Sequence, residues 1–218
     1  MSATQTSTEQ LDVPSFVGGR ANRGVRFRSG MVRQASLAGV LLAFVVVFSL
    51  LGSGFFSLQT WQSTSQYASE FLILGVAQTF VILSGGIDLS VGAIAGLSGV
   101  VSAVVMGATS SAGTPASIVI GVVAGVVVGA AVGALNGLLI ARIRITPFIA
   151  TLGTLGIASG LGYVISGGTP VTSVPSEVGT IANTIVGGWL PVLFLVSVVV
   201  VIFGMWLLAG TRLSLIHI

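Results

Sequence analysis

The chain has 218 residues, of which 54% are hydrophobic and 6% charged, with a formal net charge of +3 and a mean hydropathy of +1.09. A soluble domain carries about 25% charged residues, so this composition excludes that class and predicts an all-α, polytopic membrane protein. The absence of cysteine excludes disulfides and thiolate metal sites, and the absence of lysine excludes a Walker A phosphate loop. With five acidic residues and one histidine near the end, we expect no enzyme active site, metal, cofactor or nucleic-acid partner.

Six apolar segments can each cross a bilayer, which takes about 20 helical residues. They cover residues 35–56, 67–84, 89–108, 116–141, 147–166 and 189–209. We therefore expect a polar, arginine-rich tail over 1–34 and a transmembrane domain over 35–210. The connection 167–188 contains two prolines and could hold a short interfacial or re-entrant helix.

All eight cationic residues are arginines, and their positions predict the topology. They lie in 1–34, in 142–146 and after 209, whereas the connections 57–66, 109–115 and 167–188 contain none. Cytoplasmic loops of membrane proteins are enriched in arginine and lysine. The N-terminus, the turn 85–88, the loop 142–146 and the end of the chain should therefore face the cytoplasm.

The fourth span contains a glycine at every fourth position. A step of four residues keeps these glycines close to one helix face, so the backbone of a neighbouring helix can approach it. We interpret them as a packing surface, and a second glycine run, at 153–162, predicts that the fourth and fifth spans pack against each other. The five glycines are Gly121, Gly125, Gly129, Gly133 and Gly137.

Asp88 is the most informative residue, because it lies in the octapeptide Gly85-Gly-Ile-Asp-Leu-Ser-Val-Gly92 within an apolar stretch. An ionised group at the centre of a membrane helix costs about 2.5–3.5 kcal/mol. In one interpretation, Asp88 caps the third span by accepting the N–H of Ser90 or Val91. In the other, Gly85 and Gly86 unwind the chain, and Asp88 and Ser90 line a translocation pathway or gate.

Other polar residues near the fourth and fifth spans have structural and functional interpretations. Asn136 is expected to form an interhelical hydrogen bond. Thr146 and Pro147 should begin the fifth span as its N-cap and first residue. Thr151 and Thr154 share a face of that span and either contact a polar solute or bond to their own helix backbone. Arg142 and Arg144 either set topology at lipid headgroups or form a cytoplasmic contact, and Glu70 is expected near the outer interface.

Three motifs in the same order resemble the permease subunit of ribose-type ABC importers, which take up monosaccharides in bacteria. They are GGIDLSVG at 85–92, LNGLLIARIRITPFIATLGT at 135–154 and GGTPV at 167–171. The resemblance covers about residues 35–212. It implies a non-catalytic translocation subunit in the bacterial inner (plasma) membrane. Its implied partners are the lipid bilayer, a second permease copy, two cytoplasmic ATPase subunits and an extracytoplasmic sugar-binding protein.

By position, the resemblance assigns Gly85, Gly86, Asp88 and Ser90 to a signature near the pathway. It ends after Thr211-Arg212, so we expect 211–218 to be an aberrant or truncated end that couples poorly to an ATPase. Two alternatives remain: a related permease for branched-chain amino acids or nucleosides, and a stand-alone secondary transporter in which Asp88 binds a coupling proton.

Overall fold

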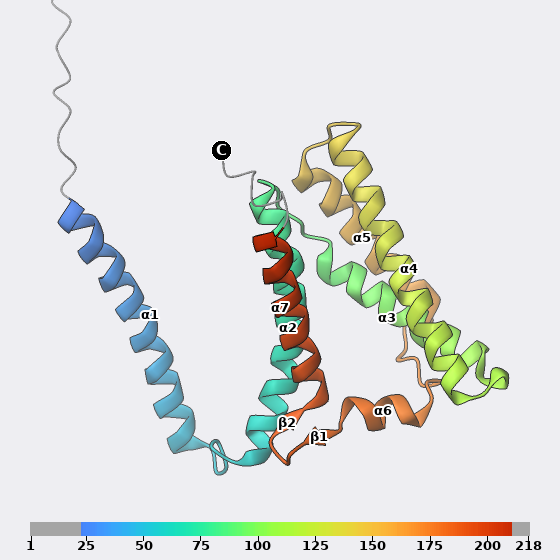
Figure 1. Cartoon of the computed structure of the whole chain (residues 1–218), viewed down its shortest axis with the longest axis horizontal. Helices are drawn as coiled ribbons and strands as arrows, with labels where there is room; N and C mark the ends of the chain where they lie inside the picture. Colours follow the sequence, from blue (N-terminus) through green and yellow to red (C-terminus); the bar gives the residue numbers. More distant parts are fainter. Residues whose placement is uncertain (1–22, 211–218) are drawn as a thin grey trace, which may run out of the picture. The chain divides into compact units, whose positions relative to one another are not determined.

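The computed structural model describes the backbone of residues 23–210 and the side chains of residues 35–210 (Figure 1). The predicted aberrant end at 211–218 and residues 1–22 of the predicted tail lie outside the described residues. The chain divides into two compact units at Phe55–Phe56. The first contains α1 (Arg23–Leu51), and every other described element belongs to the second.

The all-α membrane fold is confirmed, with five described helices long and apolar enough to cross a bilayer. The first predicted span, 35–56, corresponds to α1, whose described apolar part, Ala35–Leu51, is shorter than the other five helices. The chain is therefore a multi-pass membrane protein. The five long helices are α2 (Leu58–Leu83), α3 (Val91–Ala108), α4 (Thr114–Ala141), α5 (Pro147–Ser166) and α7 (Val192–Gly210).

Helix α2 begins nine residues before the predicted span, so the expected loop 57–66 is wrong. Ser57 occupies the N-cap position, and its hydroxyl accepts the N–H of Thr60 at 3.2 Å. The polar side chains that lower the hydropathy here bond to the connection after α5. Gln62 donates to the carbonyl of Gly188 at 2.9 Å, and Gln66 donates to that of Ala182 at 3.1 Å.

Short elements fill the connections between the long helices. The predicted helix in 167–188 is present as α6 (Ser176–Ala182), and a 3-10 turn, η1 (Ser110–Ala112), precedes α4. Strands β1 (Ile185–Val186) and β2 (Leu190–Pro191) pair antiparallel across Gly187 and Gly188, which both have positive φ. This hairpin leads directly into α7.

The long helices of the second unit pack as two groups, α3 with α4 and α5, and α2 with α7. The five glycines at every fourth position of α4 form a column, and the first three, Gly121, Gly125 and Gly129, face α3. A Cβ at Gly125 would lie 2.9 Å from the Ser98 carbonyl oxygen, and one at Gly129 would lie 3.1 Å from the Ser98 hydroxyl. These glycines therefore allow the close approach that the sequence predicts, but the partner is α3.

The described residues supply no packing neighbour for most of the remaining glycines. A Cβ at Gly133 or Gly137 would have nothing within 4 Å, and the same holds at Gly153, Gly156 and Gly160 of α5. The physical reason is that α3, with 18 residues, is too short to cover all 28 residues of α4. The uncovered end of α4 borders a cavity instead.

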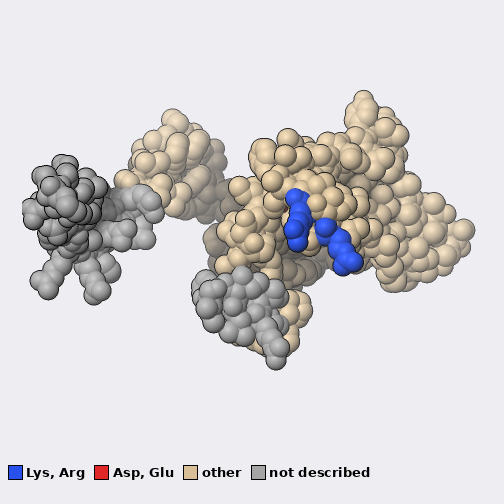
Figure 2. All heavy atoms as spheres, turned by 90° about the horizontal axis from the view of Figure 1, so that it is seen from above, with Lys and Arg blue, Asp and Glu red and all other residues tan. Residues whose placement is uncertain are grey.

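The connections of the second unit form two distinct ends. Gly107 at the end of α3 lies against Ser173, and the hairpin is bonded to the start of α2. At the other end lie the α4–α5 loop and the turn after α2. Arg142 and Arg144 are the only cationic residues among 35–210, and Figure 2 shows two basic side chains next to each other on one face.

Candidate functional site

A cavity of about 430 Å³ lies where the turn after α2 meets the end of α4 and the start of α5. Its volume is in the range of small-molecule sites, about 300–1,000 Å³. Four of the six predicted pathway or gate residues line it: Gly85, Gly86, Asp88 and Thr151. The lining residues are Val81, Ser84, Gly85, Gly86, Ile87, Asp88, Gly133, Asn136, Gly137, Ile140, Ala141, Pro147 and Thr151.

The cavity exists because α3 begins deeper along the helix axes than the points at which α2 and α4 end. Ser90, directly before α3, accepts a hydrogen bond from Asn136, and α4 continues for five more residues to Ala141. At 1.5 Å per residue, the start of α3 is recessed by roughly 7 Å. The chain reaches this depth after α2 ends at Leu83, through Gly85 with a φ of 78°. The segment 84–90 is thus irregular backbone that borders a cavity.

Four polar side chains from three segments form a continuous hydrogen-bonded chain. Ser90 Oγ donates to Asp88 Oδ1 at 2.6 Å, and Asn136 Nδ2 donates to Ser90 Oγ at 2.9 Å. Thr154 Oγ1 in turn donates to Asn136 Oδ1 at 2.5 Å. Ser90, Asn136 and Thr154 are buried. The chain of bonds therefore links the turn after α2 to α4 and α5.

The Asp88 carboxylate lies at the start of α3 and on the cavity wall. Its Oδ1 accepts the backbone N–H of Ser90 at 2.7 Å, which is one of the two bonds that the capping interpretation considers, although Ser90 itself occupies the N-cap position. The side chain is also half-buried and lines the cavity. A bond at the helix start and a place on the cavity wall coexist, and the pathway role is a proposal.

Thr151 is also a lining residue of this cavity. Its hydroxyl lies 2.8 Å from the carbonyl oxygen of Pro147 and 3.3 Å from that of Ile87, and the residue is buried. The hydroxyl therefore bonds to backbone oxygens, including one of its own helix, as in the structural interpretation of Thr151. Thr154 also lies 3.0 Å from the Ala150 carbonyl oxygen, so its single proton is shared between α5 and Asn136.

The loop at the mouth of the cavity contains the remaining predicted residues. Helix α5 begins at Pro147 with Thr146 at its N-cap position, although the Thr146 side chain makes no capping bond. Arg142 and Arg144 are exposed. Arg144 has a φ of 63°, the only positive φ of a non-glycine residue in the described chain. This left-handed conformation lets the chain turn within the five residues between α4 and α5.

Sequence reasoning placed Glu70 close to the start of its span and did not single out Gln78. Because α2 starts at Leu58, Glu70 is the thirteenth of its 26 residues. Gln78 lies two turns further along, and its side-chain oxygen is buried with no hydrogen-bond partner among the described residues. The signal for the earlier helix start was present in the serine at 57, which predicts an N-cap there.

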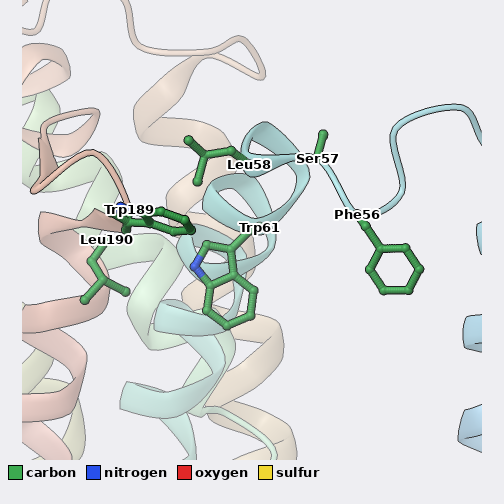
Figure 3. A pocket seen from close by; sticks show the side chains of 6 residues that line it. All are labelled: Phe56, Ser57, Leu58, Trp61, Trp189 and Leu190. Atoms are coloured by element: carbon green, nitrogen blue, oxygen red, sulfur yellow. The ribbon is translucent and has the colours of Figure 1, made fainter.

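A second cavity, of about 720 Å³, lies at the opposite end and is lined by Phe56, Ser57, Leu58, Trp61, Trp189 and Leu190. Figure 3 shows the Trp61 and Trp189 rings near each other, whereas the Phe56 ring points away. Aromatic residues of this kind gather at membrane–water interfaces. The site has no charged lining residue, so the Asp88 cavity is the stronger candidate for handling a polar solute.

The comparison with protein families decides the class of this chain. The family described as "Branched-chain amino acid transport system / permease component" matches residues 62–214. The chain belongs to this permease family. The matched range includes the Asp88 turn, all of α3 to α5 and the Asn136 network.

Curated relatives are autoinducer 2 import system permease proteins, named LsrC. The protein of Yersinia pseudotuberculosis serotype IB (strain PB1/+) is 34% identical over 78% of this chain and 48% of its own length. That of Yersinia pestis (strain Pestoides F) is 33% identical over the same shares. The chain thus spans about half the length of the curated relatives it matches. No solved structure matches the chain.

Proposed function

We propose that the chain is the membrane-spanning component of an ATP-driven, binding-protein-dependent importer in the bacterial inner membrane. The observation that carries this proposal is the polar network at the recessed start of α3, within a chain of this permease family. A broken helix that lines a cavity is a common device of membrane transporters. The chain itself performs no covalent chemistry in this proposal.

Its partners in the proposal are two cytoplasmic ATPase subunits, a second permease copy and an extracytoplasmic binding protein. Arg142 and Arg144 form a candidate cytoplasmic contact beside the cavity. The Asp88 turn acts as a gate: Gly85 and Gly86 supply the backbone freedom, and the bonds through Ser90 and Asn136 couple the turn to α4 and α5.

For the solute, we propose a ribose-type monosaccharide. The polar groups on the cavity wall are hydrogen-bonding groups and one carboxylate, with no cationic side chain among the lining residues. A neutral, hydroxylated solute needs only such groups. Asp88 could pair with the ammonium group of an amino acid, but none of the lining residues is cationic and could pair with its carboxylate.

A second candidate solute is a branched-chain amino acid, favoured by the printed description of the matching family. The curated relatives are named for import of autoinducer 2. Uptake of autoinducer 2 is therefore the third uptake to measure. The use of Asp88 as a proton site in a stand-alone transporter is not supported by the family match.

The test is Asp88→Asn, introduced into the gene in its own chromosome. Asparagine can still accept the Ser90 N–H and is a good N-cap residue, so the amount of protein in the membrane should be unchanged. Loss of the charge should reduce uptake of labelled D-ribose about tenfold, equivalent to about 1.4 kcal/mol. The control is Thr79→Val, because the Thr79 hydroxyl bonds only to Gly75 of its own helix.

Deletion of the gene provides the decisive comparison. If deletion leaves D-ribose uptake unchanged and abolishes uptake of L-leucine or autoinducer 2, the monosaccharide proposal is wrong and the importer proposal stands. If none of the three changes, the importer proposal is wrong for all three solutes. Normal uptake in the Asp88→Asn cells would leave this residue with its capping role only.

A further inference from the structure

We propose that the groove between α2 and α3 at Glu70 is a water-filled binding site for a hydroxylated solute, distinct from the Asp88 cavity. This inference rests on the proposed transport function. The groove has a volume of about 500 Å³ and is lined by Glu70, Ile73, Leu74, Gly92, Ala95 and Gly96. Its size is again in the range of small-molecule sites.

The position of Glu70 along α2 makes its environment informative. It is the thirteenth of 26 residues in a helix that is apolar enough to span a membrane. At 1.5 Å per residue, the carboxylate lies near the middle of a helix roughly 39 Å long. Ionisable residues within membrane-spanning helices are costly against lipid and almost always face the protein interior or a water-filled cavity.

Nothing in the described protein compensates this carboxylate. Glu70 is exposed, and within residues 35–210 it makes no hydrogen bond, ion pair or other electrostatic contact. The arginines at 142 and 144 lie beside the other cavity, after α4. Its hydrogen-bond partners therefore lie outside the described residues, and we assign them to water and to a solute that enters the groove.

The opposite wall of the groove is kept open by small residues. Gly92 and Gly96 lie in the first two turns of α3, and a Cβ at either position would have nothing within 4 Å. Because these turns are recessed, they face the middle of α2 rather than its end. The groove and the Asp88 cavity thus lie on two sides of the same helix start.

The chemistry of the groove selects a solute that donates hydrogen bonds. An ionised carboxylate accepts hydrogen bonds and donates none. Asp88 already occupies the start of α3, where the helix dipole would otherwise attract an anion. A neutral polyhydroxylated solute satisfies Glu70 without bringing a second negative charge beside it.

The absence of cysteine from the chain permits a direct test. Glu70→Cys is labelled with a water-soluble methanethiosulfonate in open membrane fragments, which admit the reagent from both faces. The matched control is Val126→Cys, the thirteenth residue of α4, which is 66% exposed and lines none of the three cavities described above. Labelling at 70 should be about tenfold faster or more, because charging a thiol against lipid costs more than about 1.4 kcal/mol.

Two further measurements locate and identify the site. Gly96→Leu, combined with Glu70→Cys, should fill the groove and slow labelling, whereas Gly99→Leu, one turn further along α3 and outside the groove, should not. A mixture of pentoses and hexoses should slow labelling of Ala95→Cys, an exposed lining residue whose replacement leaves Glu70 in place. None of these measurements requires ATP, an ATPase or uptake, so they can fail while the uptake experiments succeed.

Each outcome decides one part of the inference. Labelling at 70 no faster than at 126 would place Glu70 against lipid and overturn the proposal. Equal labelling in the Gly96→Leu and Gly99→Leu backgrounds would show that the reagent arrives by another route, and would overturn the assigned groove. Fast labelling at 70, together with labelling at 95 that the sugar mixture does not slow, would leave a water-filled groove and overturn the solute assignment.

Discussion

At the scale of residues, Asn136 joins the two halves of the polar network. Its amide donates to Ser90 and its oxygen accepts from Thr154, so one side chain bonds to the start of α3 and to α5. Such interhelical bonds in membranes average about 0.6 kcal/mol and reach about 1.7 kcal/mol. The network therefore stabilises the fold by only a few times this free energy, and a small change in free energy can rearrange it.

A double-mutant cycle of Asn136→Ala and Thr154→Val tests this connection. The two changes should lower the free energy of unfolding less together than the sum of their separate effects, with a coupling of about 0.6–1.7 kcal/mol. Unfolding of the purified chain in mixed micelles by dodecyl sulfate measures it. Thr79→Val replaces Thr154→Val in the control cycle, which should be additive because Thr79 bonds only within α2. Additivity in both cycles would contradict the network.

The members of this network could be selected from the sequence, but their connections could not. Asp88, Ser90, Asn136 and Thr154 are polar residues in apolar spans, which is a local signal. Asn136 is 46 residues from Ser90 and 18 from Thr154. Which hydroxyl meets which amide depends on the depth at which α3 begins, and that depth is set by tertiary packing.

At the scale of elements, the length of α3 determines both the close packing and the cavity. The 18 residues of α3 cover α4 at Gly121, Gly125 and Gly129 and leave its last turns uncovered. The glycine column predicts a helix neighbour but not where that neighbour starts. The same limit applies to α2, whose polar first turns read as a loop because their partners at 182–188 are distant in sequence.

Alanine substitutions distinguish the glycines of α4 that α3 covers from those that it leaves uncovered. Gly125→Ala should destabilise the chain by about 1–3 kcal/mol, because its methyl group would lie 2.9 Å from the Ser98 carbonyl and the helices must move apart. Gly133→Ala has open space and should be neutral or slightly stabilising, since alanine favours the helix. The same dodecyl sulfate titration measures both. Equal destabilisation would mean that α3 extends over the whole column.

At the scale of the whole molecule, the distribution of charge and aromatic residues distinguishes the two ends of the second unit. Arg142 and Arg144 lie at the end that holds the Asp88 cavity, whereas Trp61 and Trp189 line the cavity at the other end. The positive-inside rule predicts the first end to be cytoplasmic. The structure adds that the connections after α3 and α5 lie together, because Gly107 contacts Ser173.

Single cysteines in this cysteine-free chain test that orientation. Ser111→Cys and Thr172→Cys, both exposed at the predicted outer end, should react with an impermeant maleimide on intact cells. Arg142→Cys, exposed at the predicted inner end, should react only after the membrane is opened. Permeabilised cells provide the control that each thiol is reactive. Labelling of position 142 on intact cells with protection of the other two would invert the topology, and the Asp88 cavity would then open to the outside, where a solute arrives rather than leaves.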